Sequence, residues 1–250
     1  MPTSMNRSRS WLISCLAAIV VFAAPLLVAG AVTESASEIR LVRTGDNVSA
    51  LIVTGGERIL LINSNDRTET RSAIGRLARP WEPVTTTLIA PADDAAAVGL
   101  WEALRDPRIR QAIVVGTPGS DPIWSRIERE CAQRSVELEY ISTLSHVELT
   151  GAALTIEPDG MTVRVHSGGG AVAIALANLP VGLAANVAIV NDLTSMPLEV
   201  DLVVAPSFSD EDLETPIVRM NDREIVRIRF EPATLRVQGG SLQTSEPKAN

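Results

Sequence analysis

Two groups of polar residues come directly after apolar, β-rich segments of this chain. Residues 63–66 read Asn-Ser-Asn-Asp at the end of the segment 59–63, and Asp93 and Asp94 follow the segment 84–90. Carboxylates brought together at strand ends can work as a general acid and base, so a hydrolase built on Asp93, Asp66 and Ser64 is one interpretation. Asp94 has a simpler one, because Asp is a preferred N-cap and an alanine-rich helix is predicted over 94–104.

Histidine and cysteine offer little further chemistry. His146 and His166 stand twenty residues apart, at a predicted strand start and beside a glycine turn, and neither has a neighbouring Cys or His. A structural role is therefore expected for both, since zinc sites gather three or four such ligands. Cys131 falls in a predicted helix and is expected to be a small core residue. The acidic run 210–212 is interpreted as a solvated turn, with a weak Ca²⁺ contact as the alternative.

The charge balance excludes one class of partner. The 250 residues carry 22 basic and 30 acidic side chains, a formal net charge of −8, and the only lysine is Lys248. Because nucleic acids are held by clustered Lys and Arg, direct binding of DNA or RNA is not expected.

The first 32 residues resemble a membrane address. Arg7 and Arg9 precede an apolar run over residues 11–32, and no acidic residue comes before Glu34. Such a run is long enough to span a bilayer as one helix, and 29–31 read Ala-Gly-Ala, a pattern that signal peptidase cuts. A cleaved signal peptide and a retained anchor both fit. Either one places the rest of the chain outside the cytoplasm, secreted or attached to the membrane through residues 11–32.

Strand and helix patterns alternate along the exported part. Helices are predicted over 68–78, 94–104 and about 120–134. Strands are predicted over 50–53, 59–63, 84–90, 111–116, 136–141, 147–156, 162–166, 172–176, 187–190, 201–204, 225–230 and 234–237. This order predicts one domain over 33–240 followed by a flexible tail over 241–250. The fold class is α/β (α+β), an αββα sandwich of two mixed β-sheets with outer helices, preceded by one N-terminal hydrophobic helix.

Four segments, in order, resemble the metallo-β-lactamase superfamily, and most closely the soluble domain of ComEC-type DNA-uptake proteins. Residues 55–63 (GGERILLIN) resemble the opening "GG-x-x-LLID". Residues 87–100 stand where the family has "L-x-x-T-H-x-H-x-D-H-x-x-G-L". Residues 200–207 resemble the run ending in "HHGS", and 218–237 resemble the closing hairpin.

The resemblance implies a two-metal hydrolase, but this chain departs from it at the ligand positions. The family's ligands are imidazoles and carboxylates, which together generate a metal-bound hydroxide. The matching positions here, with Asp66 beside them in the same cleft, are Asn63, Pro91, Asp93, Ala95, Ala96, Asn178, Ser207 and Phe208. Asp93 alone among the matching positions carries a carboxylate, so no metal or other cofactor is expected.

Three hypotheses follow. The first is an exported pseudoenzyme with a binding or scaffold role at the cell envelope. The second is the non-metal hydrolase that uses carboxylates of the old cleft. The third is an accessory subunit of a DNA-uptake or envelope complex, which adds an envelope protein as partner.

Overall fold

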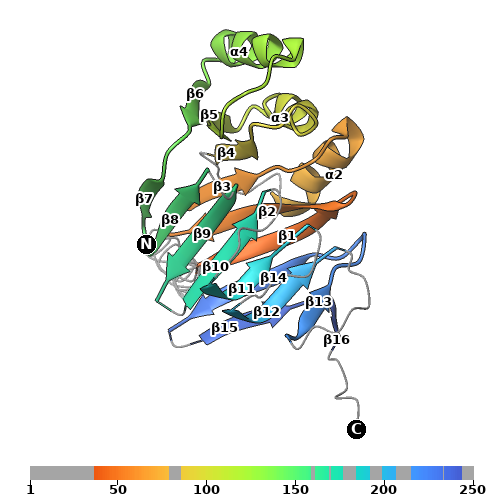
Figure 1. Cartoon of the computed structure of the whole chain (residues 1–250), viewed down its shortest axis with the longest axis vertical. Coiled ribbons are helices and arrows are strands. Elements are labelled where there is room, and N and C mark those ends of the chain that lie inside the picture. Colours follow the sequence, from red (N-terminus) through yellow and green to blue (C-terminus); the bar gives the residue numbers. More distant parts are fainter. Residues whose placement is uncertain are drawn as a thin grey trace, which may run out of the picture.

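The computed structural model describes most of the chain between residues 37 and 243. The described residues are 37–78, 86–158, 161–168, 170–176, 184–191, 199–206, 215–232 and 234–243. Within them the chain forms two eight-stranded mixed sheets and three helices (Figure 1).

The first sheet has the strand order β15-β14-β1-β2-β3-β4-β5-β6. Its strands are β1 (Glu38–Thr44), β2 (Asn47–Thr54), β3 (Glu57–Leu61), β4 (Thr86–Pro91), β5 (Ile109–Val115), β6 (Glu137–Ile141), β14 (Val226–Glu231) and β15 (Thr234–Gln238). Neighbours are antiparallel from β15 to β3 and parallel from β3 to β6. The last hairpin of the domain therefore pairs with the first strand.

The second sheet has the order β16-β13-β12-β11-β10-β9-β8-β7. Its strands are β7 (Ser145–Leu149), β8 (Ala152–Glu157), β9 (Thr162–Ser167), β10 (Gly170–Ala175), β11 (Ala184–Ile189), β12 (Glu199–Ala205), β13 (Ile217–Arg219) and β16 (Ser241–Gln243). The strands β7 to β10 form an antiparallel meander, and β10 to β13 run parallel.

The main core lies between the two sheets. Alternate side chains of a strand point to the same face, and the inward ones here are mostly Ile, Val and Leu. Ile39 and Leu41 of β1 share one buried cluster with Val163 and Val165 of β9. Because this cluster draws on both sheets, the two pack face to face as one sandwich.

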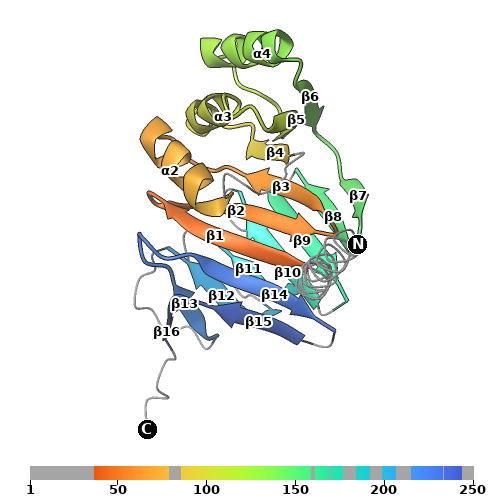
Figure 2. The same ribbon diagram turned by 180° about the vertical axis from the view of Figure 1, so that it is seen from behind.

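Three helices cover the outer face of the first sheet (Figure 2). They are α2 (Arg67–Leu77), α3 (Ala97–Ala103) and α4 (Pro122–Arg134). The Asp121 carboxylate caps α4 by accepting from the backbone N–H of Ile123 at 2.8 Å, and Pro122 occupies the first turn. A helix over about 120–134 was predicted from the sequence and is confirmed, and Pro fits its first turn because it needs no N–H partner there.

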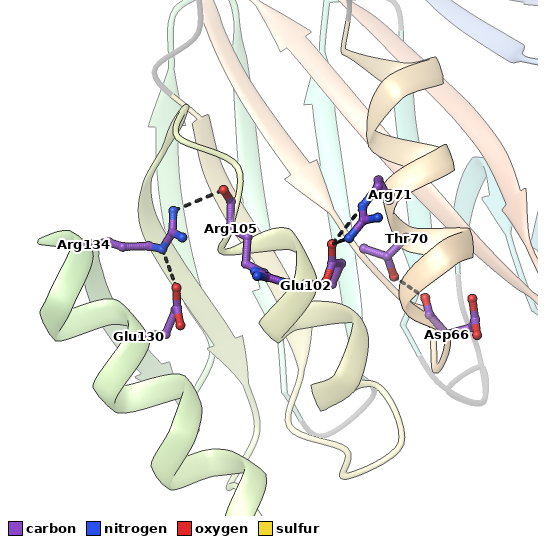
Figure 3. A network of polar contacts seen from close by, with 7 residues as sticks. All are labelled: Asp66, Thr70, Arg71, Glu102, Arg105, Glu130 and Arg134. Atoms are coloured by element: carbon purple, nitrogen blue, oxygen red, sulfur yellow. Dashed lines mark hydrogen bonds and ion pairs between the residues drawn. The ribbon is translucent and has the colours of Figure 1, made fainter.

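A polar network ties the three helices together (Figure 3). The carboxylate of Glu102 on α3 is 6% exposed and accepts from Arg71 on α2 at 2.5 Å, with Arg105 at 3.5 Å. Arg134 on α4 donates to the backbone carbonyl of Arg105 at 3.1 Å. Burial works against the charged form of Glu102. The hydrogen bonds and charges of the two arginines outweigh that effect, so the pKa of the carboxyl is lowered.

The mixed sandwich with outer helices agrees with the predicted fold class, and several local predictions need correction. The described helices all lie on one outer face. The predicted strand 147–156 is a hairpin, β7 and β8, turning at Thr150-Gly151. Strand β1 had not been predicted. Residues 241–243, assigned to the tail, form β16 against β13.

The N-terminal hydrophobic segment, residues 11–32, lies outside the described residues. Among the described helices, none is both long and apolar enough to cross a membrane.

Candidate functional site

The predicted cleft lies at the carboxyl ends of the parallel strands. Strands β3, β4 and β5 are parallel neighbours, so the residues that follow them meet at one edge of the first sheet. In the second sheet, the end of β10 faces them, because the side chain of Asn63 reaches the backbone of Leu176. This edge is where an α/β sheet most often places a ligand.

Asn63 follows β3 and joins the two sheets. It is 5% exposed, and its Nδ2 donates to the carbonyl of Leu176 at 2.8 Å. Its own carbonyl accepts from the hydroxyl of Thr44 at 3.0 Å, and its backbone N–H donates to the hydroxyl of Ser49 at 3.4 Å. Thr44 and Ser49 are themselves 3.1 Å apart. Asn63 therefore sits in a buried hydrogen-bond network that connects β1, β2, β3 and β10.

Asn191 forms a second connection between the sheets. Its Oδ1 accepts from the backbone N–H of Val48 at 3.0 Å, and its Nδ2 donates to the carbonyl of Ala175 at 3.4 Å. Sequence reasoning missed Asn191, Thr44 and Ser49. The available signal was position, because Asn191 follows an apolar strand just as Asn63 does.

The loop after β4 presents few atoms that could hold a metal. Pro91 is buried at the end of the strand, Ala96 is 3% exposed, and Ala95 is exposed. The exposed carboxylate of Asp93 accepts from the backbone N–H of Ala95 at 3.3 Å, closing a short turn. The carboxylate of Asp93 is therefore the only metal-binding group at these four positions, because the side chains of Pro91, Ala95 and Ala96 have no atom that could coordinate a metal.

Asp94 does not cap the following helix. The helix α3 begins at Ala97, its N-cap is Ala96, and no side chain caps it. The Asp94 carboxylate instead accepts from the indole N–H of Trp124 on α4 at 2.7 Å. The predicted cap is therefore wrong, because a contact thirty residues away binds this carboxylate.

Asp66 and Ser64 are engaged in the turn that starts α2. The Asp66 carboxylate accepts from the backbone N–H of Glu69 at 2.8 Å, which makes Asp66 the N-cap. The hydroxyl of Ser64 donates to the carbonyl of Asp66 at 3.1 Å and accepts from its N–H at 3.2 Å. Both side chains stabilise local backbone, in the way expected of residues that precede a helix.

Met161 lies over the strand ends of the first sheet. A Cβ atom placed on Gly116, which follows β5, would come within 3.0 Å of the methyl carbon of Met161 and 3.3 Å of Ala92. The carbonyl of Met161 accepts from the N–H of Leu176 at 2.7 Å, which holds the residue at the cleft. An apolar side chain therefore occupies space beside the predicted site.

The remaining candidates lie elsewhere or outside the described residues. His146 and His166 are exposed on β7 and β9, away from the strand ends, and His146 contacts the hydroxyl of Thr155 at 3.1 Å. Asn178, Ser207, Phe208 and the run 210–212 lie outside the described part of the chain. Within the described part, no group of three or more His, Cys, Asp or Glu residues is arranged to hold a metal ion.

Cys131 is one of the buried residues of α4. It is 2% exposed and belongs to the apolar cluster between the helices and the first sheet. Burial, together with the charges of Glu130 and Glu128, raises the pKa of its thiol to about 11. The predicted role as a small core residue is confirmed.

Comparison with known proteins finds similar chains among solved structures only. No family model matches the sequence, and no curated protein matches it. Among solved structures, the chain is similar to the metallo-β-lactamase fold protein YhfI from Bacillus subtilis. The TM-score is 0.43 at 8% sequence identity, and the alignment covers 71% of this chain and 88% of that one.

Proposed function

We propose that this chain is a non-catalytic binding or scaffold domain with a metallo-β-lactamase-like fold, working outside the cytoplasm. The observation that carries the proposal is the role of Asn63. The resemblance implies an aspartate at this position, and here an amide donates to the carbonyl of Leu176. This side chain therefore presents a donor to the facing sheet, which joins the two sheets, in place of a carboxylate.

The donor set around Asn63 does not fit a pair of zinc ions. Zinc in proteins takes His nitrogen, Cys sulfur or carboxylate oxygen, usually four ligands in all. At the described positions that match the family's ligands, only Asp93 has such an atom, and it is exposed in a turn. We therefore derive no hydrolytic step through a metal for this chain.

Metal stoichiometry tests this proposal directly. The full-length chain, refolded with excess Zn²⁺ and then desalted, should retain less than about one-tenth of an equivalent by elemental analysis. Asp93→Ala is the matched variant and should give the same low value. Two tightly retained ions per chain, lost in Asp93→Ala, would overturn the proposal.

We further propose that the domain acts at the cell envelope as an accessory to a membrane-associated complex, secreted or held by residues 11–32. The support for the location is the arginine-flanked apolar run at the N-terminus, and the accessory role rests on the resemblance to ComEC-type proteins. A C-terminal alkaline phosphatase fusion should be active in cells, since that enzyme matures only after export. Intact mass of the purified chain then distinguishes cleavage near residue 31 from a retained anchor. An inactive fusion would contradict the location.

A further inference from the structure

A groove of about 730 Å³ opens between the two sheets at the end opposite to the predicted cleft. Its lining includes Gly56 in the β2–β3 turn and Thr87 and Gln111 near the amino ends of β4 and β5. The strands β6 and β7, which form one edge of each sheet, lie beside it (Figure 1). Its volume lies in the range of ligand-binding pockets.

The groove combines apolar walls with a polar strip. Ile59 and Ile113 come from the first sheet, and Val147 and Leu154 come from the second. On the first sheet the hydroxyl of Thr87 donates to Oε1 of Gln111 at 3.1 Å. This polar pair interrupts a face that is elsewhere lined by Ile, Val and Leu, so the groove offers both apolar contact and hydrogen bonding.

Acidic side chains dominate the charges of the lining. The acidic residues of the lining are Glu57, Glu139 and Glu148, and the basic residues are Arg58 and His146. Glu139 and Glu148 are exposed and come from facing edges of the two sheets. An occupant with basic side chains would therefore complement this rim.

Strand β7 supplies the backbone for an extended occupant. All five of its residues, Ser145–Leu149, line the groove, whereas β6 contributes only Glu139 and Ile141. In the described part of the chain, β7 pairs with β8 on one side and ends the sheet on the other. Such an edge is a template for pairing with a further strand.

We propose that this groove binds an extended segment of a partner protein, in which apolar and basic side chains alternate and whose backbone pairs with β7. Period-2 alternation places the apolar side chains on the face of Val147, which packs against the core between the sheets, and the basic ones on the opposite face beside Glu148. A second copy of this chain fits poorly, because it carries a formal charge of −8 and would bring its own Glu148 to the same edge. The proposal deepens the binding role proposed above and rests on it.

Peptide binding to the full-length chain in nanodiscs of neutral lipid tests the proposal. The probes are a fluorescein-labelled octapeptide of alternating Val and Lys, a matched Val/Glu peptide, and a Val/Lys peptide N-methylated at alternate residues. The Val/Lys peptide should bind at least tenfold more tightly than either control by fluorescence anisotropy. N-methylation removes the donors of one strand edge, so it reports on backbone pairing.

Variants of the protein locate the binding. The double variant Glu139→Gln/Glu148→Gln should weaken binding of the Val/Lys peptide about tenfold. Glu137→Gln is the matched control, since Glu137 is exposed on the same strand as Glu139 but does not line the groove, and its affinity should stay within twofold of wild type. Hydrogen exchange should slow at residues 145–149 when the peptide is added.

The proposal would be overturned if the three peptides bound with equal affinity or not at all, or if Glu137→Gln weakened binding as much as the double variant does. It would also be overturned if the chain sedimented as a dimer whose interface includes β7. Each of these would leave the zinc stoichiometry unchanged. Failure of the groove is therefore distinguishable from failure of the proposed non-catalytic role.

Discussion

At the end of β3, an amide stands where the family resemblance implies an aspartate. The two side chains are almost equal in size but differ in hydrogen bonding, because Asn has an N–H donor and ionised Asp only accepts. Leu176 presents a carbonyl to this position at 2.8 Å, so only the amide can satisfy it. One atom thus decides whether the side chain at this position can join the two sheets.

Asn63→Ala should lower the free energy of unfolding by about 1–3 kcal/mol, because the carbonyl of Leu176 loses its buried donor. Urea unfolding followed by circular dichroism measures the change. Asn65→Ala is the control: Asn65 is exposed two residues further on and should change stability by less than about 0.5 kcal/mol. Equal effects of the two substitutions would show that the bond contributes nothing.

Asn63→Asp tests whether a carboxylate at the same position allows a metal to bind. A carboxylate there would be buried facing a carbonyl oxygen, so stability should fall by at least as much as in Asn63→Ala. Added Zn²⁺ should not restore it, since Pro91, Ala95 and Ala96 bring no ligand. A thermal midpoint that rises with zinc concentration in this variant would mean that a usable metal site survives.

At the scale of single elements, the helical layer depends on the charge of Glu102. This carboxylate is almost inaccessible, yet it faces the guanidinium groups of Arg71 and Arg105, which are largely exposed. It connects α2 to α3, and Arg134 extends the connection to α4. The three helices should therefore respond together to a change at this one side chain.

Glu102→Gln should lower the free energy of unfolding by about 1–2 kcal/mol at pH 7, since hydrogen bonds to charged partners are stronger than neutral ones. The pKa of Glu102 is lowered from its ordinary value of 4.5 in the folded chain. The ionised form is therefore favoured by folding, and its contribution is complete above about pH 4.5 and is lost as the pH falls through the folded pKa. Unfolding measured at pH 7 and at pH 3 should show a smaller wild-type advantage at pH 3, and an advantage independent of pH would contradict the assignment.

Substitution of the exposed residues Asp66 and Asp93 distinguishes a helix-capping role from a catalytic one. Asp66→Ala should cost about 1 kcal/mol, because the N–H of Glu69 loses its acceptor at the first turn of α2. Asp93→Ala should cost less than Asp66→Ala, since its carboxylate closes only an exposed turn. The non-metal hydrolase interpretation predicts instead that both variants abolish an esterase or phosphodiesterase activity that the wild type shows in a broad substrate screen.

For the whole molecule, local patterns predicted most elements, and long-range contacts account for the differences. The helices α2 and α4 and the strands β2 and β3 were predicted from patterns of residues a few positions apart. Strand β1 was missed because its charged residues obscure the apolar ones, and Glu38 pairs not only with Arg40 on β1 but also with Arg227 and Arg229 on β14. The two arginines on β14 are almost two hundred residues away in the sequence.

The site was harder to predict than the fold for the same reason. The sequence has no histidine at the positions where the resemblance implies one, but it did not show what the residues at those positions contact. The contact of Asp94 with Trp124, the position of Met161 over Gly116 and the role of Asn191 all join segments that only the packed sheets bring together. The groove beside β7 likewise depends on how the sheets diverge.

The shared core predicts that the sandwich unfolds as one unit, although domains of this size often populate intermediates. Residues of β1, β9 and β14 belong to one buried cluster, so neither sheet can leave without exposing the other. With Trp11 and Trp81 replaced by Phe, fluorescence from Trp101 and Trp124 reports on the helical layer and circular dichroism on the sheets. The two midpoints in urea should coincide. Phe230→Ala on β14, which should cost about 3–5 kcal/mol, should shift both signals equally, because Phe230 is 7% exposed in the shared core. A shift in circular dichroism alone would show that the helical layer unfolds independently of the sheets.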